Sequence, residues 1–171
     1  METSRKKALE IMQKGITIYH LLCNEYDVSD HFGDGFDLIA EKEKKFVKIE
    51  LKAIDLNSIK NGNRATQYVS ANEIVIATHL IITVFKGVEI NANYIMSIRQ
   101  FVENSGVKKF DEYKCFEEFI AEYKELAVEK SKKVKNSGRE KSRLDFDFNF
   151  NPSKTEEWRF ASFKDQWGNL L

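Results

Sequence analysis

The chain has 171 residues, enough for one hydrophobic core with a tail and too few for two ordinary domains. Hydrophobic residues make up 42% and charged residues 32%, which is typical of a globular domain and excludes disorder along the whole chain. The 27 basic and 27 acidic residues cancel, so net charge does not steer the protein toward nucleic acid or an anionic membrane. Any affinity for DNA must come from a local basic patch.

The N-terminus and the cysteines favour a cytoplasmic protein. The chain begins Met-Glu-Thr-Ser-Arg-Lys-Lys, without the apolar stretch of a signal peptide, and Thr and His interrupt its longest apolar run, residues 74–85. Cys23 and Cys115 both lie in apolar stretches. We therefore expect buried free thiols rather than a disulfide or a zinc site, and no membrane span.

The first predicted element is an amphipathic helix over residues 4–23. Its apolar residues are three and four positions apart, as on one helix face, and they are Leu9, Met12, Ile16, Tyr19 and Cys23. The stretch 29–35 contains two glycines and predicts a loop.

A β-hairpin is predicted next, with strands at 36–40 and 45–53 around the charged turn 41–44. In the second strand, apolar and charged residues alternate, so one face is expected in the core and the other carries charged side chains. The apolar positions are Val47, Ile49, Leu51 and Ala53, and the charged ones are Lys48, Glu50 and Lys52.

Strands and helices follow through the rest of the core. Residues 67–69 predict a short strand, and Ser70 with Glu73 forms the capping pattern of a helix that ends near residue 79. Further strands are expected at 80–85, 88–90 and 94–98, and a helix with a core-facing apolar stripe at 115–130. The pattern predicts an α/β fold whose helices flank the sheet.

The C-terminal part has a different composition. After a core domain over 1–130, residues 131–143 are rich in Lys and Arg and predict a basic linker. In the extension 144–171, Phe alternates with polar residues up to Phe150, as in a half-buried strand. We expect this aromatic extension to pack against the domain or a second subunit. The linker residues expected to contact DNA phosphates are Lys132, Lys133, Lys135 and Arg139.

Two acidic residues are expected to oppose each other in the hairpin. A turn centred between Glu43 and Lys44 places Asp37 opposite Glu50. Like charges in directly opposed positions destabilise a sheet, and Mg²⁺, which prefers carboxylate oxygens, would compensate them. Lys52 follows on the same strand face, where its ammonium can reach a phosphate or an attacking water.

Asp37, followed after a hairpin-sized gap by Glu50-Leu51-Lys52, resembles the signature of the PD-(D/E)XK nuclease superfamily, which includes restriction endonucleases, junction resolvases and some homing endonucleases. The resemblance covers residues 4–100, with Phe36 in place of the proline that names the motif. It implies a restriction endonuclease-like fold with a central mixed sheet.

The same resemblance assigns roles to the residues. Asp37, Glu50 and the backbone carbonyl of Leu51 would hold Mg²⁺, with Mn²⁺ as a substitute, and Lys52 would assist the attacking water. In this superfamily a helical glutamate upstream often joins the metal ligands, and Glu10 occupies that place. Glu10 equally fits an exposed helix residue paired with Lys14.

Two further positions bear on the site. Residues 68–73 resemble a variant found in defence-associated nuclease domains, in which a helix opens with Ser-x-Asn-Glu, and Gln67 is a polar residue beside such a site. Asp34, between two glycines, is an alternative to Asp37 as the acidic ligand. The histidines at 20, 31 and 79 lack metal-ligand spacing, so we expect core or surface roles for them.

The sequence therefore predicts a magnesium-dependent endonuclease acting on DNA, as a homodimer or homotetramer because cutting both strands requires two sites. The alternative is a catalytically idle nuclease-fold module that binds DNA or a protein partner. A third hypothesis is a subunit of a defence complex that docks through its aromatic extension. Glu50 and Lys52 would also fit an ordinary solvated strand face.

Overall fold

The computed structural model describes the backbone of residues 2–31, 33, 35–59, 64–105, 113–133 and 146–170, without the side chains of 2–3, 126–133 and 147. The helices are α1 (Glu2–Cys23), α2 (Ala71–Ile76), α3 (Ile98–Asn104) and α4 (Phe116–Lys133). The strands are β1 (Asp27–Asp30), β2 (Leu38–Lys42), β3 (Lys45–Asp55), β4 (Ala65–Val69), β5 (His79–Lys86), β6 (Glu89–Ser97) and β7 (Phe146–Phe150).

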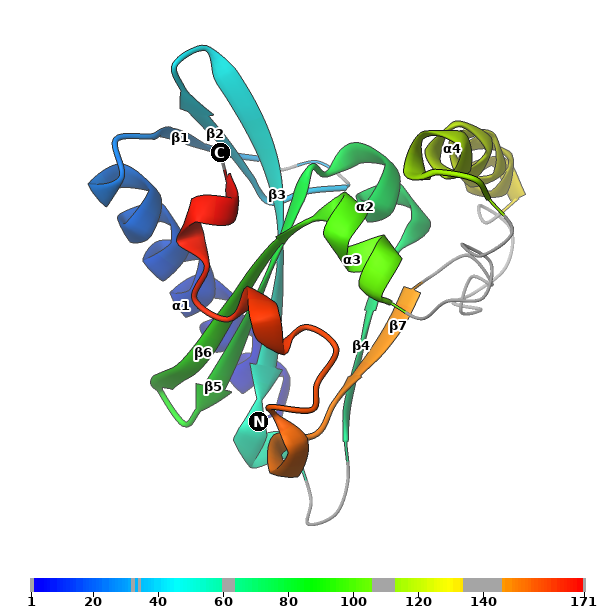
Figure 1. The fold of residues 1–171 in the computed structure, drawn as a ribbon. Coiled ribbons are helices and arrows are strands. Elements are labelled where there is room, and N and C mark those ends of the chain that lie inside the picture. Colours follow the sequence, from blue (N-terminus) through cyan, green and yellow to red (C-terminus); the bar gives the residue numbers. More distant parts are fainter. Residues whose placement is uncertain are drawn as a thin grey trace.

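Five strands form a central sheet in the order β1-β2-β3-β5-β6, while β4 and β7 form a separate pair (Figure 1). β3 and β5 run parallel, and the other neighbours in the central sheet are antiparallel. The predicted α/β fold, with a central mixed sheet flanked by helices, is confirmed.

The β2–β3 hairpin has the predicted register, with Leu38 opposite Ile49 and Lys42 opposite Lys45. Glu43 and Lys44 have φ values of 52° and 64°, the left-handed conformations that a tight two-residue hairpin turn requires. Because β2 begins at Leu38 rather than at the predicted residue 36, its pairing with β3 ends at Ile49.

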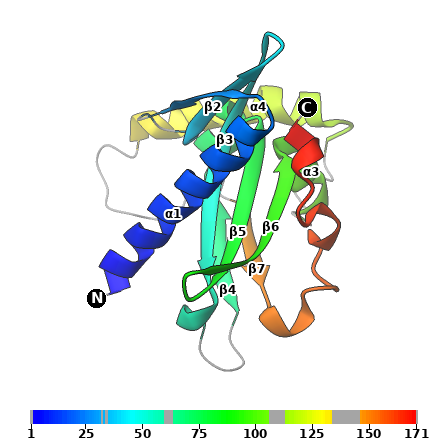
Figure 2. The same ribbon diagram turned by 90° about the vertical axis from the view of Figure 1, so that its left-hand side faces the viewer.

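Side chains of β5 alternate between two cores, one on each face of the sheet. Leu80 and Ile82 lie in a large core with residues of α2, α3, α4 and the β4–β7 pair. Ile81 faces the opposite side, where Leu21 of α1 and Leu170 near the C-terminus complete a smaller core. Figure 2 shows α1 lying across this second face.

The aromatic C-terminal segment belongs to the large core. Phe148, Phe150 and Phe160 are buried there, and Phe160 stacks on Phe101 of α3 with ring centroids 5.3 Å apart. The indole of Trp158 donates a hydrogen bond to the Asn149 carbonyl at 2.8 Å. The segment therefore packs against residues of the central sheet and its helices within the same chain.

The predicted core face of α1 is confirmed at Leu9 and wrong at Tyr19 and Cys23, which are exposed. The buried positions of the helix are Leu9, Gln13, Thr17 and Leu21, whereas Tyr19 is 65% exposed. The side chain of Gln13 donates to the Lys52 carbonyl at 3.0 Å, the Ile81 carbonyl at 3.2 Å and the Thr83 hydroxyl at 3.0 Å. A polar side chain can be buried when it is hydrogen-bonded, so Gln13 occupies a core position that the apolar pattern did not predict.

Both cysteines are free, as predicted, but exposed, whereas burial was expected. Cys23 lies at the end of α1 on the side turned away from the sheet, because the helix packs through the row that contains Leu21. Cys115 immediately precedes α4 and does not enter its core-facing stripe, in which Phe119 and Tyr123 are buried.

Several element boundaries also differ from prediction. Asp27–Asp30, partly assigned to a loop, pairs with β2 as an edge strand. β6 is one continuous strand rather than two, and α3, which was not predicted, begins directly after it. Ser97 and Gln100 form the capping box of α3, a signal hidden inside an apolar stretch that also fits a strand.

Among the described residues, none of the helices combines the length and apolar character needed to cross a membrane.

We predict that Phe160→Ala lowers the free energy of unfolding by about 3–5 kcal/mol, because it leaves a cavity among the aromatic rings of the large core. The matched control is Phe46→Ala on the hairpin, where the ring is 61% exposed and the expected loss is within about 0.5 kcal/mol. Urea denaturation of both variants measures the difference. Equal losses would show that the C-terminal aromatic segment does not stabilise the core.

Candidate active site

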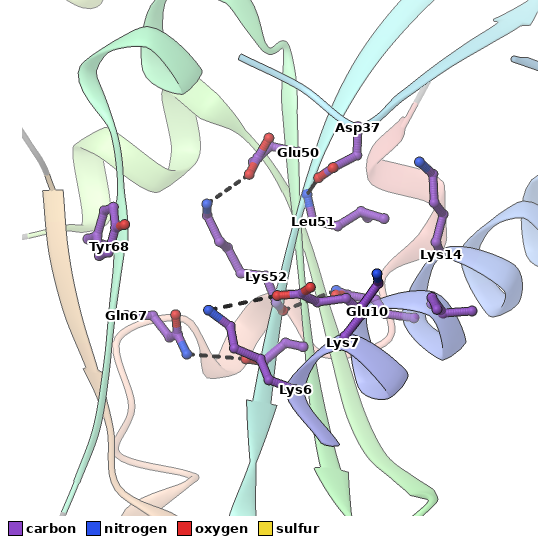
Figure 3. A pocket seen from close by; sticks show the side chains of 13 residues that line it. Lys6, Lys7, Glu10, Lys14, Asp37, Glu50, Leu51, Lys52, Gln67 and Tyr68 are labelled. Atoms are coloured by element: carbon purple, nitrogen blue, oxygen red, sulfur yellow. Dashed lines mark hydrogen bonds and ion pairs between the residues drawn. The ribbon is translucent and has the colours of Figure 1, made fainter. Parts of the chain in front are cut away.

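A cleft of about 440 Å³ opens beside β3, where β2 has left it. The floor is β3 from Glu50 to Ala53. One wall is α1, with Lys6, Lys7, Glu10 and Lys14, and the opposite wall is β4, with Gln67 and Tyr68 (Figure 3). Asp37 closes the end next to the hairpin.

Two side chains bind backbone groups on the edge of β3 that faces the cleft. Asp37 Oδ2 accepts a hydrogen bond from the Leu51 N–H at 2.9 Å, and Gln67 Nε2 donates to the Ala53 carbonyl at 3.2 Å. The backbone of Asp37 is itself fixed, because its N–H donates to the Ile49 carbonyl at 2.8 Å. The structure thus brings Asp37, Leu51 and Gln67 together at one edge.

A partly buried charge cluster includes Glu50 and Lys52 of the cleft floor. Lys52 Nζ lies 2.8 Å from Glu50 Oε1 and 3.0 Å from each carboxylate oxygen of Glu73. Glu73 sits in the first turn of α2, where its Oε2 also accepts the Ser70 N–H at 2.7 Å. The predicted pair of Glu50 and Lys52 therefore has a third member from a different element.

Glu73 is a site residue that the sequence analysis identified only as a helix cap. Its capping box with Ser70 is confirmed. The same carboxylate contacts Lys52. The sequence pattern could not predict this contact, because α2 and β3 come together only in the folded chain. The Ser-x-Asn-Glu pattern was the one signal that could have raised this residue above a capping role.

Burial raises the pKa of Glu50 to about 8, with Lys52 opposing the shift and the charges of Glu73 and Asp37 adding to it. Burial lowers the pKa of Lys52, but the attraction of Glu50 and Glu73 outweighs it, so the net shift is upward. The ammonium is therefore charged at neutral pH. Two carboxylates contact one lysine, and Asp37 adds a third negative charge near Glu50, so the cluster lacks positive charge.

Glu10 lies in the cleft, but its nearest recorded partner is Lys6, at 3.8 Å, rather than the predicted Lys14, which pairs with Asp30. In the part of the chain that the structure describes, no three His, Cys, Asp or Glu side chains form a group that could hold a metal ion. Glu10 therefore does not join Asp37 and Glu50 in a three-member acidic cluster.

The remaining predicted residues fall outside what the structure describes. Asp34, the alternative ligand, lies outside the described residues, as do Lys135 and Arg139. Lys132 and Lys133 belong to the last turn of α4, but their side chains are not described.

The histidines pack against other residues of the fold. His20 stacks on Trp167 with ring centroids 4.3 Å apart, and His31 stacks on Phe36 at 3.9 Å. Burial lowers the pKa of His79, which keeps its ring neutral at pH 7.

No protein-family model matches the chain, and no curated protein is significantly similar to it. Among solved structures, the fold is similar to that of a bacterial homing endonuclease, I-Ssp6803I, with a TM-score of 0.45 and 17% sequence identity. The match covers 56% of this chain and 67% of that chain. At this level of similarity, conclusions about activity must come from the geometry of the cleft.

The raised pKa of Glu50 predicts a pH-dependent stability in the absence of divalent cations. A carboxyl whose pKa is higher in the folded state than its ordinary 4.5 stabilises the fold fully below pH 4.5. That contribution is lost as the pH rises through about 8. We expect the melting temperature in EDTA to fall between pH 6 and pH 9, and to fall less in Glu50→Gln.

Differential scanning calorimetry of the wild type, Glu50→Gln and the exposed control Glu10→Gln checks this. Glu10→Gln should retain the wild-type slope. The same slope in all three proteins would mean that Glu50 titrates normally and that the cluster carries no excess negative charge.

Proposed function

We propose that the protein is a magnesium-dependent endonuclease that hydrolyses phosphodiester bonds in DNA. The observation that carries this proposal is the Lys52 ammonium held between buried Glu50 and partly buried Glu73, with Asp37 near Glu50, beside an open cleft. Burying several charges costs stability, and such clusters with strongly shifted pKa values are concentrated at functional sites.

The residues fit a hard divalent cation. Mg²⁺ takes oxygen ligands, commonly one or two carboxylates completed by waters and a substrate phosphate, so a three-member acidic cage is not required. Asp37 uses Oδ2 for the Leu51 N–H, which leaves Oδ1 for a ligand. The Leu51 carbonyl points to the same edge as its N–H, because both groups of a strand residue face the same neighbour.

We assign Asp37, Glu50 and the Leu51 carbonyl as the groups that would hold Mg²⁺ or Mn²⁺, with Glu10 as a candidate further acidic group in the cleft. When bound, the cation would activate a water molecule and stabilise charge that develops on the phosphate. A cation also supplies the positive charge that the cluster lacks, which lowers the cost of ionising Glu50.

Lys52 is the residue proposed to contact the scissile phosphate or the attacking water. Its ammonium is charged, partly buried and lies at the cleft from β3, and it can stabilise negative charge on a phosphoryl oxygen. Glu73 is a positioning residue, since it holds the ammonium without belonging to the proposed cation ligands. Lys6 and Lys7 line the α1 wall, where they can neutralise neighbouring phosphates.

The alternative function is a catalytically idle module that binds DNA or a protein partner. The ion pairing of Lys52 with two carboxylates favours it, because an ammonium that keeps both partners does not contact a substrate. This alternative predicts that DNA affinity is indifferent to Mg²⁺ and that no condition produces nicks. A homodimer or homotetramer and a defence-complex partner remain proposals that accompany the two functions.

We predict that Lys52→Ala lowers the rate of plasmid cleavage at least about 100-fold, the lower range for loss of a positioned catalytic group. Supercoiled plasmid is incubated with each protein and Mg²⁺ or Mn²⁺, with EDTA as the metal-free control. The matched control Lys48→Ala removes an exposed lysine from the same strand and should cleave like the wild type. A fully active Lys52→Ala would exclude Lys52 from the chemistry, and an inactive wild type would favour the idle module.

We also predict that Glu73→Gln lowers the cleavage rate about 10- to 100-fold without unfolding α2. Glutamine serves as well as glutamate in a capping box, so the substitution removes the charge and keeps the helix cap. The measurements are kcat, KM and the melting temperature. A variant with normal stability and normal kcat would show that Glu73 acts only as a helix cap.

A further inference from the structure

The two walls of the cleft present different chemistry. The α1 wall carries Lys6, Lys7 and Lys14 with one acidic residue, Glu10, among them. The β4 wall carries Tyr68, whose ring is half exposed, at 51% (Figure 3). The ring centroid lies 5.9 Å from Lys52 Nζ, so the aromatic surface is next to the proposed catalytic ammonium.

β4 does not depend on Tyr68 for its position. Its backbone pairs with β7, where Tyr68 lies opposite Asp147. The two neighbours of Tyr68 anchor the strand, because Val69 is fully buried in the large core and Gln67 donates to the Ala53 carbonyl. The ring already faces the Lys52 ammonium, and its exposed part can contact a ligand in the cleft.

Cationic side chains on one wall and an aromatic ring on the other suit a ligand with phosphates on one side and flat apolar rings on the other. A nucleic acid strand has this construction. In a duplex the base faces are covered by their stacked neighbours, and only base edges are accessible in the grooves. A tyrosine ring can stack on a base face when the nucleotide is unpaired.

The dimensions of the cleft suit a single strand of nucleic acid. The cleft volume of about 440 Å³ falls within the range, about 300–1,000 Å³, of pockets that enclose single small ligands. The 5.9 Å from the ring centroid to Lys52 Nζ is less than two nucleotide steps of about 3.4 Å each in a stacked strand. A base on Tyr68 would belong to a nucleotide beside the phosphate that Lys52 contacts.

We propose that the cleft binds DNA with an unpaired nucleotide next to the scissile phosphodiester, its base stacked on Tyr68 and its backbone along Lys6 and Lys7. This inference rests on the proposed nuclease function for the identity of the scissile bond. The protein's preferred substrates are then single strands, gaps and fork junctions rather than continuous duplex.

The test is a binding measurement in EDTA, so that it does not depend on cleavage. Fluorescence anisotropy gives the Kd of a labelled single-stranded oligodeoxynucleotide, of its duplex, and of the duplex with a gap. The wild type and Tyr68→Phe should bind the single strand and the gapped duplex more tightly than the continuous duplex. Tyr68→Leu, which removes the aromatic face, should weaken single-strand binding about 5- to 150-fold, since stacking contributes about 1–3 kcal/mol per base.

Two controls separate stacking from other effects. Phe46→Leu changes another exposed aromatic residue, on the hairpin and away from the cleft, and should leave every Kd unchanged. Lys7→Ala should lower the slope of log affinity against log salt by about 0.7, the value for one phosphate contact on a single strand.

The outcomes distinguish this inference from the nuclease assignment. Single-strand affinity that falls in Tyr68→Leu and survives in Tyr68→Phe supports the inference, even if the wild type cleaves nothing. A Tyr68→Leu protein that binds single strands like the wild type overturns it, even if plasmid cleavage is robust. Tighter binding of the continuous duplex by the wild type overturns it as well.

Discussion

The separation of β2 from β3 at Ile49 is the constraint on which the candidate site depends. Beyond that residue, the edge of β3 that faced β2 needs other hydrogen-bond partners, because buried backbone groups without partners are costly. Asp37 and Gln67 supply them from outside the strand. Asp37 is thereby fixed beside Glu50, and β4 is drawn toward the same edge. The departure of β2 therefore accounts both for the open edge of β3 and for the position of Asp37.

The walls of the cleft are tied to its floor through buried polar contacts. Gln13 of α1 donates to the carbonyl of Lys52 and to the Thr83 hydroxyl, which in turn donates to the Asn93 side chain at 3.0 Å. The Asn93 N–H donates to Asp165 in the C-terminal segment, also at 3.0 Å. A continuous polar network therefore links α1, the sheet and the C-terminal segment. Such a network is strong when every member is satisfied, and it fixes the basic wall relative to Lys52.

Local patterns predicted the parts of this site that depend on sequence neighbours. Alternation in β3 and a two-residue turn were enough to predict the hairpin register, although the predicted Asp37–Glu50 pair lies beyond the last paired position, Leu38 opposite Ile49. The same reasoning failed for α1, because burial of Gln13 depends on acceptors from β3 and β5. Glu73 and Tyr68 were missed for a related reason. Their contacts with Lys52 cross between elements whose packing is a property of the whole fold.

The charge balance of the cluster also determines when Lys52 is released from one of its carboxylate partners. Lys52 has two carboxylate partners, and only Glu50 is a proposed cation ligand. When Glu50 neutralises a cation instead, Lys52 retains Glu73, so the ammonium stays in position but loses half of its ion pairing. Without a cation, Lys52 remains held by both carboxylates, and burial keeps the pKa of Glu50 raised, with the charges of Glu73 and Asp37 adding to the shift. The endonuclease and the idle module thus differ in whether Glu50 exchanges its lysine for a cation.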